Sequence, residues 1–262
     1  MWKSRRLVGW FFLTVGVQLL FRFPFLRAQM IPHHLDFQPG IVLVPLAAVF
    51  FGPAGVWGAL AGSLLGDKLF GQWNVLSWYR AAGFFFFALG TQRLWDHTFR
   101  RDAPAPELSR SWFLALRFTF VSWSGCFVAA SWRAMGSELA RAYPFAYIVS
   151  LLVLNNLIFC TLLGAALYRL MAGYWVPRFG GWREAMPGGA EWERTSWLNA
   201  CFIVAGGVGS CLAGLFVSNT FYRVGPLQPF TFGSATGVLV PLIVIPLLLV
   251  QAVGVLRREG SK

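Results

Sequence analysis

Long apolar runs separated by short polar segments make up most of the chain. Most of these runs approach or exceed the roughly 18 residues that read as a bilayer-spanning helix. We predict helical spans near residues 7–21, 41–51, 54–70, 78–95, 111–132, 144–171, 197–222 and 232–256. The expected fold class is all-α, a polytopic membrane helix bundle.

The second and third runs are short for complete crossings, and the tight turn Gly52-Pro53-Ala54-Gly55 separates them. They form either a tilted pair or a re-entrant hairpin. The chain returns to the side that it left in both cases, so the predicted topology of the later spans does not depend on the choice.

Composition supports a membrane class. Hydrophobic residues make up 57% of the chain and charged residues 12%, whereas about a quarter of the residues of a soluble domain are charged. The net charge of +12 does not indicate nucleic-acid binding, because the basic residues lie between the apolar runs. In such positions they set the orientation of the spans.

The distribution of basic residues predicts the topology. With a cytoplasmic N-terminus, fourteen Lys and Arg residues fall on the cytoplasmic side and seven on the other, with Arg117 inside a span. By the positive-inside rule, this bias places both termini in the cytoplasm. We expect a multi-pass protein of a bacterial cytoplasmic (inner) membrane.

A change in composition divides the chain. Residues 173–196 are rich in Gly, Pro and charged residues, as is typical of a linker. We predict a membrane domain at 1–172, a cytoplasmic linker at 173–196 and a C-terminal transmembrane helical hairpin at 197–262.

No motif predicts catalysis, a metal site or a cofactor. A GxxxxGK[ST] phosphate loop is absent from the sequence, which excludes ATP hydrolysis by that mechanism. The adjacent His33 and His34, with Asp36, lack identifiable further ligands. Buried free thiols are expected for the four cysteines, which lie in apolar runs without CxxC spacing: Cys126, Cys160, Cys201 and Cys211.

Small residues recur at helical spacing in two runs. Gly58, Gly62 and Gly66 lie one turn apart in the third run, and Gly209 and Gly214 belong to two stripes in a later run. Small residues four apart let helix backbones approach closely in lipid. We predict a helix-packing or docking role for these five glycines.

Polar side chains near the predicted outer ends of the spans are candidates for a small-molecule site. Asn155 and Asn156 interrupt an apolar run, where an amide needs a partner on another helix or on a ligand. Aromatic rings beside Arg and Asn suit a small, flat, polar ligand, although interfacial anchoring also explains each ring. The candidate substrate-binding residues are His34, Asp36, Gln38, Trp73, Asn74, Trp78, Arg80, Arg133, Arg141, Asn155 and Asn156.

Two stretches, Phe37–Lys68 and Tyr143–Met171, resemble the substrate-binding S component of energy-coupling factor (ECF) transporters. The resemblance rests on the GP-x-G turn at Gly52, on the Gly/Ala-rich run that ends in Gly66-Asp67, and on the last core run with Asn155-Asn156. It covers residues 1–172.

The resemblance implies a six-helix core that binds a vitamin or similar micronutrient from outside, with residues 22–40 as a lid. It also implies two kinds of partner, a transmembrane coupling protein and cytoplasmic ATPases. Two features depart from the family. The first run carries Gly9 and Gly16 seven apart rather than small residues four apart, and the C-terminal pair exceeds the six-helix fold.

Two other classes remain open. A multi-helix membrane sensor or adaptor domain would signal through a separate partner protein. A lipid-modifying enzyme would need an acid/base or metal cluster inside the membrane. The sequence offers only scattered residues of these types and no cluster, so we expect no enzymatic activity.

Overall fold

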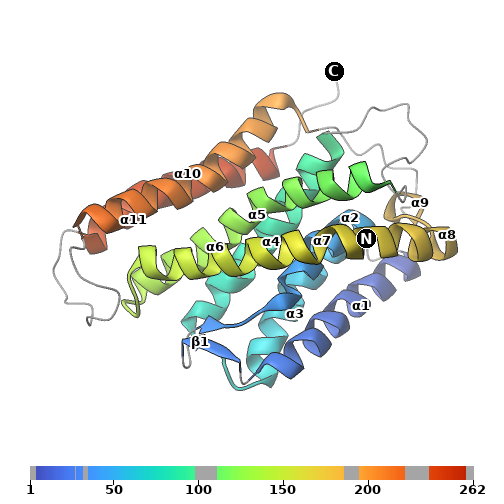
Figure 1. Ribbon diagram of the computed structural model, residues 1–262, viewed down its shortest axis with the longest axis horizontal. Coiled ribbons are helices and arrows are strands. Elements are labelled where there is room, and N and C mark those ends of the chain that lie inside the picture. The colour runs from blue at the N-terminus through green and yellow to red at the C-terminus, as the bar shows by residue number, and fades with distance from the viewer. Residues whose placement is uncertain are drawn as a thin grey trace.

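The computed structural model is a helical bundle, and it describes residues 4–26, 28–31, 35–97, 111–185, 195–221 and 236–257 (Figure 1). The helices are α1 (Arg5–Arg22), α2 (Leu43–Phe51), α3 (Pro53–Leu69), α4 (Val75–His97), α5 (Trp112–Leu139), α6 (Phe145–Leu162), α7 (Gly164–Leu170), α8 (Val176–Phe179), α9 (Trp182–Ala185), α10 (Trp197–Phe221) and α11 (Thr236–Leu256). A small antiparallel hairpin, β1 (Gln29–Ile31) with β2 (Leu35–Asp36), follows α1.

Within the described residues, five segments are long and apolar enough to cross a membrane. They are Arg5–Phe25, Trp112–Leu139, Phe145–Leu162, Trp197–Thr220 and Val238–Leu256. Large apolar side chains on them lie exposed, such as Phe113 at 71% and Phe216 at 72%. Apolar surface on this scale indicates contact with lipid, so the architecture is that of a multi-pass helical membrane protein.

The segment α2 lies in the interior of the first part of the bundle, whereas α3 and α4 also carry exposed apolar side chains such as Trp57 and Trp78. A 3₁₀ turn, Pro39–Val42, leads into α2, and together they form a short apolar segment. All but the first residue of α2 are buried. The expected spans 41–51, 54–70 and 78–95 are helices in the structure. They are not among the five segments that are long and apolar enough to cross a membrane.

The turn between α2 and α3 depends on Gly52. Its φ of 57° and ψ of −133° lie in a region that favours glycine. A Cβ at this position would lie 2.4 Å from Cδ2 of Trp182. Glycine therefore both reverses the chain and leaves room for an indole ring that comes from α9.

The glycine stripe of α3, formed by Gly58, Gly62 and Gly66, packs on α1. A Cβ on Gly58 would lie 2.6 Å from Cβ of Thr14, and one on Gly62 would lie 2.8 Å from Oε1 of Gln18. Each pair of partners is 44 positions apart, so α1 and α3 run parallel. This direction follows because α2 carries the chain back before α3 begins.

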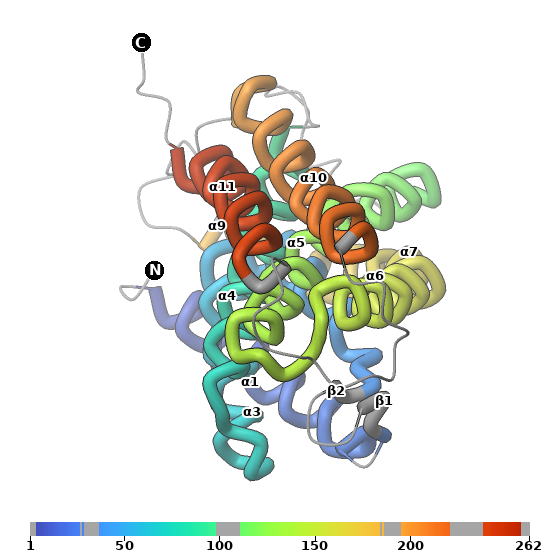
Figure 2. The backbone as a smooth tube through the Cα atoms, turned by 90° about the vertical axis from the view of Figure 1, so that its left-hand side faces the viewer, coloured from blue at the N-terminus to red at the C-terminus, as the bar shows by residue number. Residues whose placement is uncertain are grey.

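Two larger apolar cores and one small cluster connect the described helices. Around Phe118 and Tyr168, whose rings stack at 5.4 Å, the first core joins α1, α2 and α4 to α5 and α7. The second core joins α5 and α6 to α10 and α11. Figure 2 shows α10 and α11 on the side of α5 that lies away from α1 and α3.

The long helix that begins with α6 continues into the predicted linker. After α7, a π-helical segment, Met171–Trp175, leads into α8. Gly180, with a φ of 72°, ends α8. The helix thus extends to Phe179, and residues 186–194 of the predicted linker lie outside the described part of the chain.

Candidate functional site: a pocket beneath the hairpin

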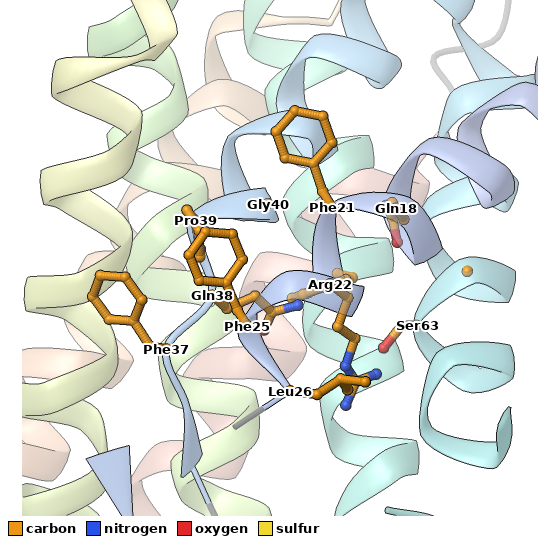
Figure 3. Close-up of a pocket in the computed structure, with 12 residues that line it drawn as sticks. Gln18, Phe21, Arg22, Phe25, Leu26, Phe37, Gln38, Pro39, Gly40 and Ser63 are labelled. Carbon is orange, nitrogen blue, oxygen red and sulfur yellow. The ribbon is translucent and has the colours of Figure 1, made fainter. Parts of the chain in front are cut away.

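A pocket lies where α1 and α3 meet the segment between α1 and α2 (Figure 3). The cavity itself is about 20 Å³, which is room for about one water molecule. It lies within about 480 Å³ of space between atoms that includes space open to solvent. The lining residues are Gln18, Phe21, Arg22, Phe25, Leu26, Phe37, Gln38, Pro39, Gly40, Gly62, Ser63 and Phe84.

One wall of the pocket carries an ion cluster. Arg22 Nη2 lies 2.6 Å from Asp67 Oδ1, and Arg80 Nη1 lies 2.5 Å from the same oxygen. Arg22 also donates a hydrogen bond to the Gln72 side-chain oxygen. Asp67 is 1% exposed, and both arginines are buried. The cluster thus joins α1, α3 and α4 at the end of the bundle that carries the hairpin.

Helix spacing explains why these side chains meet. Gln18 and Arg22 are one turn apart on α1, and Ser63 and Asp67 are one turn apart on α3. Residues four apart lie on one helix face. Gly62 and Gly66 let α1 approach closely enough for both pairs to face each other: a Cβ on Gly66 would lie 2.8 Å from Nη1 of Arg22.

The polar atoms near the pocket without a hydrogen-bond partner among the described residues include Gln18 Nε2, Ser63 Oγ and Asp67 Oδ2. Gln18 and Ser63 line the pocket, and Ser63 is 3% exposed. Buried polar groups are normally hydrogen-bonded. A nitrogen donor and a hydroxyl beside empty space therefore indicate that a polar ligand or water completes the site.

Phenylalanine rings supply the apolar wall. Phe25 and Phe37 lie 6.1 Å apart between ring centroids, and Phe37 meets Phe159 of α6 edge-on at 5.0 Å. Figure 3 shows Phe37 across the pocket from Ser63. The segment between α1 and α2 therefore extends from α1 to α6 and forms one side of the pocket.

Few of the predicted site residues lie at this pocket. Gln38 lines it, and Arg80 adjoins it through Asp67. His34 lies outside the described residues, and Asp36 is described only as part of the β2 backbone.

Three predicted residues lie on the surface near the start of α4. Trp73 and Trp78 are exposed and meet edge-on at 5.5 Å, an arrangement that suits interfacial anchoring. Asn74 accepts a hydrogen bond from the backbone N–H of Leu76 at 2.8 Å. It therefore acts as a cap for α4.

The remaining four lie along α5 and α6. Arg133 is buried within α5, and Arg141 is exposed after its end, with a φ of 56°. The amide of Asn155 donates to Asn156 Oδ1 at 3.2 Å, and Asn156 donates to the Cys126 carbonyl at 3.5 Å. The asparagines thus contribute to the contact between α5 and α6.

The predicted packing glycines differ in their surroundings. Gly58, Gly62 and Gly66 contact α1 as described above. A Cβ on Gly214 would lie 2.4 Å from the Phe145 ring, whereas one on Gly209 would meet only Leu247 at 3.9 Å. Gly214 thus lies at a close contact between helices, and Gly209 at an ordinary one.

The candidates predicted from the sequence did not include Gln18, Arg22, Ser63 or Phe84, which line the pocket. The available signal was the four-residue spacing of Gln18 and Arg22 in the first run, which matches that of Ser63 and Asp67 in the third. No group of three or more metal-binding side chains occurs among the described residues. No protein-family model, curated protein or solved structure matches the chain.

Proposed function

We propose that this chain is the membrane-embedded substrate-binding component of an ECF-type ABC uptake transporter for a vitamin or similar micronutrient. The observation that carries the proposal is the pocket between α1, α3 and the described part of the connection between α1 and α2. There Ser63 and Gln18 present polar atoms without partners among the described residues. A site of this composition suits a small ligand with a flat apolar body and a few polar groups.

The covering segment supports capture from one side. Phe25, Phe37 and Gln38 belong to the connection between α1 and α2 and also line the pocket. A ligand could enter or leave by movement of this connection, without separation of the buried cores. The residues 22–40 would then act as the lid that the resemblance implies.

The distribution of basic residues predicts which side of the membrane the pocket faces. If both termini are cytoplasmic in a bacterial inner membrane, then α1 crosses outward and its end at Arg22 lies at the outer side. The pocket and the hairpin would then face the exterior. In this orientation a six-helix core formed by 1–172 would hold the substrate, and the pair α10–α11 would extend it.

Transport would need partners. Because the chain has no phosphate loop, cytoplasmic ATPases acting through a transmembrane coupling protein would supply the energy. The exposed apolar faces of the long helices offer surface for such a coupling protein as well as for lipid.

Ligand identification in the purified chain tests the binding step. We expect native mass spectrometry of the protein in micelles to reveal a co-purified small molecule. Gln18→Leu and Ser63→Ala should each reduce its retention by about tenfold, because each removes a hydrogen-bonding group from the pocket. Trp78→Leu, a matched exposed control, should retain the ligand as the unaltered chain does.

Uptake distinguishes transport from sensing. Cells that express the chain with its ATPase partners should accumulate the identified ligand, and Gln18→Leu should reduce this accumulation. A retained ligand without ATPase-dependent accumulation would favour a sensor or adaptor. Equal ligand retention by Gln18→Leu, Ser63→Ala and Trp78→Leu would contradict the pocket itself.

A further inference from the structure

A second hollow lies at the opposite end of α1 from the hairpin. It is lined by Arg6, Trp10, Arg178, Phe179 and Gly180, with about 570 Å³ of empty space including the part open to solvent. These residues come from the first turns of α1 and from α8 with the turn after it. Segments far apart in the sequence therefore build one site.

Both arginines at this hollow lack a partner in the described structure. Neither Arg6 nor Arg178 forms a hydrogen bond or an ion pair with any described residue, and both are exposed. Two guanidinium groups facing one space repel each other unless an anion lies between them. The planar fork of a guanidinium group matches the oxygens of a phosphate.

The floor of the hollow, formed by Trp10 and Phe179, belongs to a connected set of aromatic rings. Trp10 stacks on Phe51 at 5.6 Å, Phe51 meets Trp175 at 5.3 Å, and Trp175 meets Phe179 at 4.5 Å. This packing holds α8 against α1 and α2. Because Trp10 is one turn from Arg6 on α1, the same packing fixes the position from which Arg6 extends.

The location of the hollow favours an amphipathic occupant. The segment Arg5–Phe25 is long and apolar enough to cross a bilayer, so its first turn lies at a membrane boundary. Phe179 beside the arginines is 48% exposed. Basic pockets at such boundaries bind the head groups of anionic lipids.

We propose that Arg6 and Arg178 form a binding site for a phosphate group, carried by an anionic phospholipid or by a soluble phosphate. This site is separate from the pocket beneath the hairpin, and it does not depend on the proposed transport function. Occupancy would link α1 to α8 across the aromatic floor.

Titration of the purified full chain in a phosphate-free sugar detergent tests the site. Native mass spectrometry would measure the retention of phosphatidylglycerol and of diacylglycerol, which has the same acyl chains but no phosphate. We expect phosphatidylglycerol to be retained and diacylglycerol to be lost. Arg6→Gln and Arg178→Gln should each reduce phosphatidylglycerol affinity by about tenfold, the loss expected for a charge-assisted hydrogen bond.

Arg5→Gln is the matched control, because it removes the same charge from the adjacent position, which does not line the hollow. We expect it to leave the affinity within about twofold, the range of ordinary surface substitutions. An equal loss in Arg5→Gln, as general attraction to a basic surface predicts, would overturn the proposal. Equal retention of diacylglycerol would also overturn it.

Competition with inorganic phosphate distinguishes a phosphate group carried by a phospholipid from a soluble phosphate. Binding of phosphatidylglycerol that excess inorganic phosphate does not displace assigns the site to lipid. Binding of inorganic phosphate to the unaltered chain, lost in Arg6→Gln and Arg178→Gln, assigns it to a soluble phosphate. If neither compound binds, the proposal fails. Thermal unfolding of each variant verifies that the fold is intact.

Discussion

Arg80 on α4 donates a 2.5 Å hydrogen bond to Oδ1 of Asp67 on α3. Because Arg22 of α1 reaches the same oxygen, one buried carboxylate holds two guanidinium groups from different helices. The pocket beneath the hairpin adjoins this contact. The stability of the bundle and the shape of the pocket therefore depend on the same charged group.

Replacement of that carboxylate should be strongly destabilising. Asp67→Asn leaves Arg22 and Arg80 buried without their shared counter-charge, and we expect a loss of about 3–5 kcal/mol in the free energy of unfolding. Unfolding in mixed micelles measures the loss. Lys68→Gln changes the neighbouring exposed residue and should shift the free energy by less than about 0.5 kcal/mol. Similar values for the two variants would contradict a structural role for the cluster.

The glycine stripe of α3 gives a second prediction. Gly58→Ala places a Cβ 2.6 Å from Cβ of Thr14 and 3.0 Å from the Phe11 carbonyl oxygen. We expect overpacking to destabilise the bundle by about 1–3 kcal/mol, measured as above. At Gly9 and Gly16 of α1, an added Cβ would have no atom of the described residues within 4 Å apart from the local helix backbone.

Those two positions are the controls for the stripe. Gly9→Ala and Gly16→Ala should be neutral, or stabilising by up to about 1 kcal/mol through helix propensity. If Gly58→Ala behaves as they do, then α1 and α3 do not pack closely through the stripe.

The turn at Gly52 depends on two effects that a double-mutant cycle can separate. Gly52→Ala should destabilise the fold because of its φ of 57° and also because the new Cβ meets Trp182. The backbone part alone is about 1–3 kcal/mol. In a Trp182→Ala background the steric part is removed, so the same substitution should be less destabilising. Additive effects would show that the indole ring does not restrict position 52.

Asn155 and Asn156 are adjacent but should differ in their effects. Asn156→Leu removes the bond to the Cys126 carbonyl and leaves the buried amide of Asn155 without its acceptor. Asn155→Leu removes one bond and also the Asn155 Oδ1 atom, which has no partner among the described residues. We expect Asn156→Leu to be more destabilising by about 1 kcal/mol. The opposite order in unfolding measurements would contradict this hydrogen-bond network.

Local patterns were sufficient to predict most of the helices. The expected span 54–70 is the helix Pro53–Leu69, and the turn before it begins at Gly52 as expected. Apolar run length and Gly-Pro turns act over a few residues, so they can be read without knowledge of the fold. The continuation of the α6 helix to Phe179 was not expected, because the glycines and charges of 173–196 suggest a linker.

The candidate site was less predictable. Proximity to the predicted outer ends of the spans suggested Trp73, Trp78 and Arg141, which the structure places on the surface. The pocket instead uses Gln18 and Ser63, which lie within apolar runs. A sequence pattern shows which face of a helix a residue occupies, but not which helix lies opposite that face.

By itself, the sequence determined the class of protein, the approximate positions of most of the helices and the bias of basic residues, since each depends on local composition. Tertiary structure decided that α1 and α3 run parallel with a 44-residue offset, which brings Arg22 to Asp67 and Gln18 to Gly62. It also brought Arg6 and Arg178 to one hollow. Such pairings depend on side-chain volumes and on close contact between particular helices, and these act between residues that are distant in the chain.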